Sequence, residues 1–171
     1  PHHTNEIAQS EAYLGHKWCN YWFHVMHLNT NSGKMSKSSG EFLTVSLLED
    51  KGYDPLAYRF FCLQSHYRRT LVFSYDALDN AVAAYTRLLL RIAGLDFEDA
   101  APFDAQAAQA LRAGFAAALD NDLNTSLAIT ALYDVLKSPV NDRTKIQLLE
   151  EFDTVLSLDL IESAKKRRQA P

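Results

Sequence analysis

The sequence predicts a mainly α-helical fold whose second half is a bundle of helices. In one long segment apolar residues recur at alternating spacings of three and four, the period of one buried helix face. Several segments begin with residues that commonly cap helices. The 171 residues are 47% apolar and include nine Phe and eight Tyr, which is enough to bury a core. We therefore expect one or two folded domains.

In the first half, short helices are expected to alternate with irregular chain. Gly15 ends the first helix, Thr44 caps the second, and Asp54 followed by Pro55 starts the third. The segment 18–29 is aromatic and β-branched enough for a strand or a strand-like crossing. The expected helices span about residues 5–14, 44–51 and 54–64.

A long helix from Ser74 to Gly94 opens the second half, followed by an acidic linker at 96–104 and a helical bundle. The basic tail 165–168 is expected to be frayed. Three more helices are expected at about 105–119, 125–137 and 142–156. The expected buried stripe of the long helix consists of Tyr75, Leu78, Val82, Tyr85, Leu89 and Ile92. The expected inward residues of the last helix are Ile146, Leu149, Phe152 and Leu156.

The formal net charge of -4 is unevenly divided along the chain. Residues 1–95 carry nine Lys+Arg against eight Asp+Glu, a balance of +1, and residues 96–171 carry eight against thirteen, a balance of -5. Because nucleic-acid affinity depends largely on neutralising phosphates, the acidic half is a poor general binder of polyanions. Any contact with RNA there would need a local patch or readout of the bases.

Other features of the composition concern location and processing. The sequence has no uninterrupted run of about 18 apolar residues, so no membrane span is expected. The start has no signal-peptide pattern and no initiator Met, so we expect a piece of a longer protein. Cys19 and Cys62 lack metal-ligand spacing and cannot form a disulfide framework, which fits a reducing cytoplasm.

Two lysines three residues apart form the most informative motif of the chain. Lys34, Met35 and Lys37 lie in a Ser-rich stretch between Gly33 and Gly40. Ammonium groups make charge-assisted hydrogen bonds to phosphate, and small residues let the backbone approach it. The alternative is a solvated surface loop. The run Lys-Met-Ser-Lys-Ser resembles the KMSKS loop of class I aminoacyl-tRNA synthetases.

His2 and Glu6 are four residues apart at a predicted helix start, so their side chains can face one point. An imidazole nitrogen and a carboxylate oxygen are suitable ligands for zinc. The alternative is an ordinary surface pair. Two further ligands would be required, and neither Cys19 nor Cys62 is convincingly placed to supply them.

Six segments, in order along nearly the whole chain, resemble the cysteinyl-tRNA synthetase family. The first is similar to PHHENEIAQSEA, the second to NYWMH, and the last to a segment of that family's helical bundle. The segments are residues 1–11, 20–24, 58–61, 65–68, 73–74 and 120–125.

The resemblance implies a Rossmann-type catalytic domain that is split by an insertion and followed by a helical anticodon-binding bundle. Residues 1–72 would form the trailing edge of the catalytic domain, with the KMSKS loop and a stem-contact region. Residues 73–171 would form the bundle, with the linker at 96–104.

The resemblance also implies a ligase that activates L-cysteine with ATP and Mg²⁺ and then transfers it to tRNA(Cys) in translation. Lys34 and Lys37 would be catalytic, since cations aimed at a departing pyrophosphate stabilise the transition state. Met35 and His24 would also lie at the nucleotide, although His24 could equally be a histidine at the edge of the core.

In that family zinc is held by two Cys, one His and one Glu, and it binds the substrate thiolate. His2 and Glu6 fall on the His and Glu positions, while both Cys partners and the His-x-Gly-His signature would lie upstream. We therefore expect these 171 residues alone to be inactive. The parent protein is expected to be a cytoplasmic monomer.

A small basic and aromatic patch, residues 66–69, contains Arg68 and Arg69. Arginines that position phosphates are common in nucleic-acid interfaces, so these two are candidates for contact with the tRNA stem. A purely structural role for the loop is the alternative.

The sequence departs from the family pattern in two places, and two other functions stay open. Ser39 and Glu41 stand where the family loop continues Leu-Gly-Asn after its serine, and Thr4 replaces a common Glu. One alternative is a cysteine ligase that acts on an amino-sugar. The other is a non-catalytic RNA-binding or adaptor paralogue that has kept the scaffold.

Overall fold

The computed structural model describes residues 2–30, 33–34 and 44–169, with only the backbone described at 33–34. Helices dominate this part of the chain, which confirms the predicted fold class. The helices are α1 (His2–Leu14), α2 (Val45–Asp50), α3 (Pro55–Leu63), α4 (Tyr75–Ala93), α5 (Ala105–Asp120), α6 (Thr125–Lys137), α7 (Asp142–Leu156) and α8 (Leu160–Gln169). The strands are β1 (Leu28–Thr30), β2 (Gly33–Lys34) and β3 (Leu71–Phe73).

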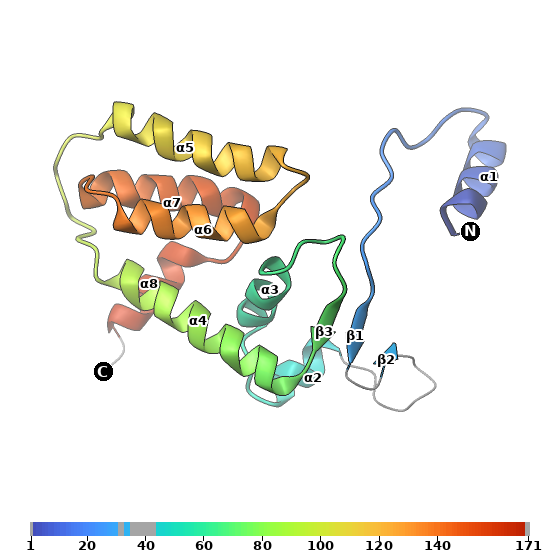
Figure 1. The fold of residues 1–171 in the computed structure, drawn as a ribbon, viewed down its shortest axis with the longest axis horizontal. Coiled ribbons are helices and arrows are strands. Elements are labelled where there is room, and N and C mark those ends of the chain that lie inside the picture. Colours follow the sequence, from blue (N-terminus) through green and yellow to red (C-terminus); the bar gives the residue numbers. More distant parts are fainter. Residues whose placement is uncertain (1, 31–32, 35–43, 170–171) are drawn as a thin grey trace.

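Most of the helices form two packed groups (Figure 1). α5, α6 and α7 lie side by side as a bundle, and α4 packs against both α3 and α8. The short sheet has the order β2-β1-β3, with β1 antiparallel to β2 and parallel to β3. α1 buries none of its residues and lies apart from the bundle.

Local capping explains why several helices begin where the sequence predicts. The side chain of Thr44 accepts a hydrogen bond from an amide of α2 at 3.1 Å, and Asp54 does the same for α3 at 2.8 Å. Ser74 caps α4 at 3.1 Å, while Asn124 and Asn141 cap α6 and α7 at 3.1 and 2.8 Å. Each cap satisfies an amide that has no partner within its helix.

The predicted linker joins α4 to α5, but it is tied to the bundle. Asp99 accepts hydrogen bonds from the backbone amides of Ala101, Asp142 and Arg143 at 2.9, 3.0 and 3.3 Å. These bonds hold the acidic linker against the N-terminus of α7, where a carboxylate is also favoured by the helix dipole.

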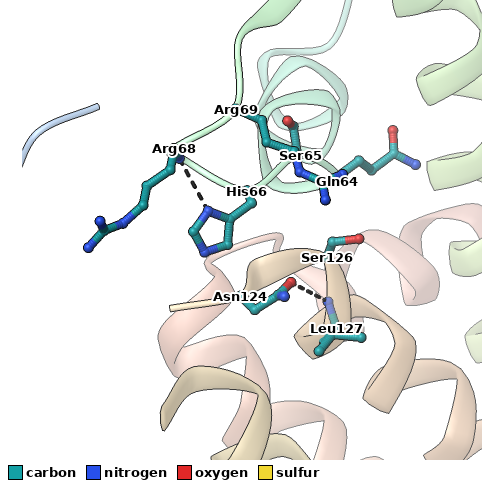
Figure 2. A pocket seen from close by; sticks show the side chains of 8 residues that line it. All are labelled: Gln64, Ser65, His66, Arg68, Arg69, Asn124, Ser126 and Leu127. Carbon is teal, nitrogen blue, oxygen red and sulfur yellow. Dashed lines mark hydrogen bonds between the residues drawn. The ribbon is translucent and has the colours of Figure 1, made fainter. Parts of the chain in front are cut away.

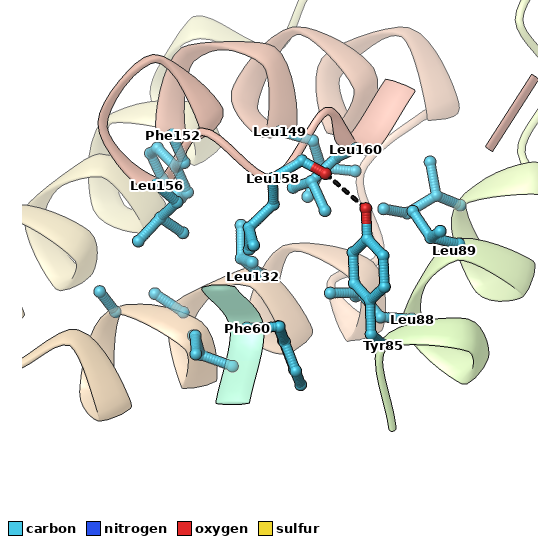
Figure 3. Packing of buried hydrophobic residues seen from close by; sticks show 14 of the residues in the cluster. Phe60, Tyr85, Leu88, Leu89, Leu132, Leu149, Phe152, Leu156, Leu158 and Leu160 are labelled. Carbon is cyan, nitrogen blue, oxygen red and sulfur yellow. Dashed lines mark hydrogen bonds between the residues drawn. The ribbon is translucent and has the colours of Figure 1, made fainter. Parts of the chain in front are cut away.

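The buried core joins the two groups of helices, as Figure 3 shows. Phe115 of α5 stacks on Phe152 of α7 with ring centroids 4.0 Å apart. Tyr85 of α4 lies against Phe60 of α3, with centroids 5.6 Å apart. Of the expected inward residues of α7, Leu149, Phe152 and Leu156 are buried, and Ile146 is partly buried.

Four expectations need correction. The first helix begins at His2 rather than Asn5, and only the last two residues of the segment 18–29 join a strand, β1. Tyr75 was expected in the buried stripe of α4 but is 40% exposed. It begins the helix and stacks on the neighbouring Tyr53 instead of entering the core.

The basic tail is the fourth correction, because residues 165–168 are helical and belong to α8. Leu160, Ile161 and Ala164 of that helix are buried, so its apolar side packs into the core. Arg168 donates a hydrogen bond at 3.2 Å to the carbonyl of Leu95, just beyond α4. Tertiary packing of this kind stabilises a helix that its polar sequence alone would not.

Within residues 2–30, 33–34 and 44–169, none of the helices is both long enough and apolar enough to cross a membrane.

Candidate functional site

The first candidate site is a hollow of about 330 Å³ between the start of α1 and the segment that leads to β1. We call it the histidine hollow. It brings together His2 from α1 and His24 from the following segment, two of the residues that the sequence singled out. Its lining residues are His2, His3, Thr4, Phe23, His24, Val25 and His27.

His3 is a central residue of the histidine hollow that the sequence analysis missed. Its ring lies 4.6 Å from the ring of Trp22 and 4.3 Å from that of His24, centroid to centroid. Its Nδ1 is buried and has no hydrogen-bond partner among the described residues. The only sequence signal was its position next to His2, since its ring partners are about twenty residues away.

The expected zinc ligands are only partly brought together. His2 and Glu6 both lie on α1 with exposed side chains, and Glu6 does not line the histidine hollow. Across the part of the chain that the structure describes, no three His, Cys, Asp or Glu residues are grouped for a metal ion. Their chemistry suits zinc, but two donors fall short of the three or four protein ligands that zinc sites use.

The lysine motif continues directly from the sheet beside this region. Lys34 pairs with Asn29 across the antiparallel β1–β2 ladder, so its backbone is fixed next to the segment that carries His24. Met35 and Lys37, with Ser39 and Glu41, lie outside the described residues.

The second candidate site is a cleft of about 450 Å³ between the C-terminal end of α3 and the first turn of α6 (Figure 2). We call it the arginine cleft. Next to the cleft, Thr125 donates a 2.7 Å hydrogen bond to the carbonyl of Leu63 and so joins the start of α6 to the end of α3. Its lining residues are Gln64, Ser65, His66, Arg68, Arg69, Asn124, Ser126 and Leu127.

Asp122, in the turn between α5 and α6, binds the loop that forms one wall of the arginine cleft. Its carboxylate accepts hydrogen bonds from the hydroxyl of Tyr67 at 2.5 Å and from Arg68 Nη2 at 3.3 Å, and Arg68 Nε forms an ion pair with it at 2.7 Å. The Tyr67 hydroxyl, followed by the Arg68 guanidinium, holds the pKa of Asp122 below its usual value. Its backbone carbonyl lies 2.9 Å from His66 Nε2.

The same geometry fixes the tautomer of His66. Its Nδ1 accepts a hydrogen bond from the amide of Arg68 at 3.2 Å, so Nε2 carries the proton and donates it to the carbonyl of Asp122. His66, Tyr67 and Arg68 thus all contact Asp122, as the structural alternative for this loop expects, and contact with tRNA stays a prediction.

The two arginines of the cleft differ in their charge environment. The charge of Arg68 is compensated by Asp122, and the hydrogen bond to Tyr67, followed by the charge of Asp122, raises the pKa of Arg68. Arg69 makes no ion pair with any described residue, and its side chain points toward α6, whereas Arg68 points away (Figure 2). An uncompensated guanidinium beside a helix N-terminus favours an anionic ligand.

Two family models match the chain. Residues 1–83 match the catalytic domain of class I (C) tRNA synthetases, and residues 114–160 match the DALR domain. The first match covers both the histidine hollow and the lysine motif, and the second covers the turn that holds Asp122. The fold and these matches place the chain in the class I aminoacyl-tRNA synthetase family.

Curated relatives specify the member of that class. A cysteine–tRNA ligase of Novosphingobium aromaticivorans is 41% identical over 94% of this chain and 35% of its own length. A cysteine–tRNA ligase 1 of Burkholderia lata is also 41% identical, over 94% of this chain and 33% of its own length. A cysteine–tRNA ligase of Treponema denticola is 35% identical over 95% of this chain and 37% of its own length. The chain belongs to the cysteine–tRNA ligase family and spans about a third of the length of these relatives.

Proposed function

We propose that this chain is part of an enzyme that activates L-cysteine with ATP and attaches it to tRNA(Cys). The observation that carries the proposal is the identity of 41% with cysteine–tRNA ligases over 94% of the chain. The relatives described above all act, by name, on tRNA, which favours this function over ligation to an amino-sugar or a non-catalytic adaptor role.

In the first step, an oxygen of the cysteine carboxylate attacks the α-phosphorus of Mg²⁺-bound ATP. A P–O bond forms, the bond to the β-phosphate bridging oxygen breaks, and pyrophosphate leaves with the bonding electrons. Because the carboxylate is already ionised, no general base is needed. Lys34 and Lys37 stabilise the charge that gathers on the pyrophosphate, and the β1–β2 ladder supports this role by fixing the backbone of Lys34.

His24 and Met35 complete the proposed nucleotide contacts. The placement of His24 in the wall of the histidine hollow, on the segment that leads into β1, supports a position beside the nucleotide. In the second step the terminal ribose hydroxyl of the tRNA attacks the carbonyl carbon of the adenylate and forms an ester bond. The acyl–phosphate bond breaks, and AMP leaves while its phosphate takes up the hydroxyl proton.

His2 and Glu6 are proposed as two of the ligands of a zinc ion whose remaining ligands lie outside these 171 residues. When bound, such an ion holds the thiolate of the substrate cysteine. The i,i+4 spacing on α1 supports this role because it places both donors on one side of the helix.

We propose that Arg69, with Arg68, contacts the phosphate backbone of the tRNA. The uncompensated charge of Arg69 in an open cleft supports this role. Residues 1–72 would then form the end of the catalytic domain with its stem-contact loop, and residues 73–171 the helical anticodon-binding bundle. A cytoplasmic, monomeric enzyme of translation is part of the same proposal.

The proposal is tested with the whole protein. Purified enzyme should exchange pyrophosphate into ATP only when L-cysteine is present, and it should charge tRNA(Cys) but not an amino-sugar. Cysteine activation followed by transfer to the amino-sugar would favour the first alternative. Binding of tRNA without any pyrophosphate exchange would favour the adaptor.

A further inference from the structure

Tyr67 connects two parts of the molecule that are distant in sequence. Its ring packs on the ring of Phe23, with centroids 4.3 Å apart, and its carbonyl accepts a hydrogen bond from the amide of Met26 at 2.9 Å. Among the described residues and outside the strand ladders, no other hydrogen bond joins the backbone of segment 16–27 to another backbone group. Tyr67 therefore anchors that segment to the loop after α3, while His3 contacts it from α1.

The anchored stretch forms part of the histidine hollow. Phe23, His24 and Val25 line it, and Met26 follows directly. Phe23 and Met26 are 52% and 50% exposed, so burial of their own side chains contributes little to holding them. The position of His24 therefore depends on the two contacts that Tyr67 makes on either side of it, together with the contact of its own ring with His3.

Tyr67 is itself held from the bundle. Its hydroxyl donates a 2.5 Å hydrogen bond to Oδ1 of Asp122, and Arg68 binds the other oxygen of the same carboxylate at 2.7 Å. Hydrogen bonds to a charged acceptor are the stronger kind. With His66 bound to its carbonyl, Asp122 thus holds three consecutive residues of the loop at 66–68.

Asp122 is in turn fixed by the turn between α5 and α6. Its φ is 55°, in the left-handed region that Asp enters more readily than most residues. The amides that follow it bond back to α5, from Leu123 to Leu119 at 2.8 Å and from Asn124 to Ala118 at 3.1 Å. The carboxylate is held by the end of a 16-residue helix rather than by a free loop.

We propose that Asp122 is a positioning residue for the histidine hollow: through Tyr67 it fixes the segment that carries His24. Contact between the α5–α6 turn and a ligand would then be transmitted to the hollow along covalent and hydrogen-bonded links. The positioning follows from the contacts alone, and its consequence for catalysis rests on the proposed function.

Amide hydrogen exchange of the 171-residue chain tests the positioning. The probe is the amide of Met26, and the amide of buried Leu132 in α6 reports global unfolding. In the variants D122A and Y67F, exchange at Met26 should accelerate about tenfold relative to Leu132, as expected for the loss of one charge-assisted hydrogen bond. Y67F keeps the ring that packs on Phe23 and removes only the hydroxyl.

The matched control is D120N, since Asp120 is exposed, lies two residues earlier and has no ion pair among the described residues. It should leave Met26 unchanged. Equal exchange rates of the Met26 amide in D122A and D120N would overturn the proposal. So would an acceleration at Met26 in D122A that the Leu132 amide shows to the same degree, because that would reflect global unfolding. If D122A does not fold, the variants Y67F and D122N test the proposal by the same ratio of exchange rates at Met26 and Leu132.

The catalytic arm uses the whole protein. D122A should lower kcat for cysteine-dependent pyrophosphate exchange severalfold, while D120N should not. If the wild-type protein lacks this exchange, the proposed function fails, and the Met26 result still decides the positioning. If the wild type is active and D122A accelerates Met26 without changing kcat, the link from Asp122 to the nucleotide site is wrong.

Discussion

The hydroxyl of Tyr85 donates a 2.6 Å hydrogen bond to the backbone carbonyl of Leu158, which lies 73 residues later (Figure 3). Tyr85 is in the middle of α4, and Leu158 is in the short turn between α7 and α8. Both residues are at most 1% exposed. This bond satisfies a buried carbonyl and ties the long helix to the end of the bundle.

The variant Y85F should be less stable than the wild type by about 1–2 kcal/mol, because it leaves the carbonyl of Leu158 without this donor. Urea unfolding of the 171-residue chain at pH 7 measures the difference. Y13F is the matched control, since Tyr13 is 90% exposed, and it should have no effect. Unchanged stability of Y85F would mean that another donor replaces the hydroxyl.

The stability of Y85F should also depend on alkaline pH differently from that of the wild type. Burial raises the pKa of Tyr85 to about 12 from 10.0, so the folded state favours the protonated phenol. That stabilisation is complete below pH 10 and is lost as the pH rises toward 12. The wild type should therefore lose stability more steeply than Y85F in this window. Tyr58, whose pKa burial also raises to about 12, is present in both proteins and cancels in the comparison.

The variant D99N should flatten the loss of stability in acid. Hydrogen bonds from the amides of Ala101 and then Arg143 hold the pKa of Asp99 below 3.8. A lowered folded-state pKa stabilises the protein above the unfolded value, and this contribution is lost as the pH falls through the folded value. Thermal unfolding between pH 5 and about pH 2 measures it. Parallel curves for wild type and D99N would contradict this account of the linker, and D120N serves as the control.

Changing Lys37 to Ala in the whole protein should reduce the rate of cysteine-dependent pyrophosphate exchange. Loss of one group that stabilises transition-state charge typically costs about 10²–10³ in kcat. The matched control is K137A, because Lys137 is an exposed lysine in the last turn of α6. If K37A and K137A exchange pyrophosphate equally fast, Lys37 has no catalytic role.

Changing Arg69 to Ala should raise KM for tRNA and leave pyrophosphate exchange unaltered, since the proposed contact is to phosphate. A single lost phosphate contact should also reduce the salt dependence of tRNA binding by about one unit of slope. R167A removes an exposed arginine from α8 and is the control. Equal tRNA affinity of the two variants would rule out Arg69 as a contact.

The 171 residues by themselves should not exchange pyrophosphate into ATP, even with cysteine and zinc added. They span about a third of the related ligases and, within their described part, bring no three metal donors together. Steady-state exchange assays at high protein concentration measure this. Exchange above background would show that residues 1–171 hold a complete nucleotide site.

The sequence alone determined most helix boundaries, because capping acts over three or four residues. Asn124 and Asn141 precede α6 and α7, and those helices span residues 125–137 and 142–156, as predicted. The lysine motif and the pair formed by His2 and Glu6 were equally local signals. They supported the family resemblance, which the family models and the curated relatives confirmed.

Only the tertiary structure decided features that depend on distant partners. α8 is a helix because its apolar residues meet α4, although its sequence is polar, and His3 joins the histidine hollow because Trp22 and His24 fold back onto it. The pairing of Tyr67 with Asp122 spans 55 residues. No local pattern encodes such contacts, since packing and hydrogen bonding between distant segments depend on how the whole chain encloses its core.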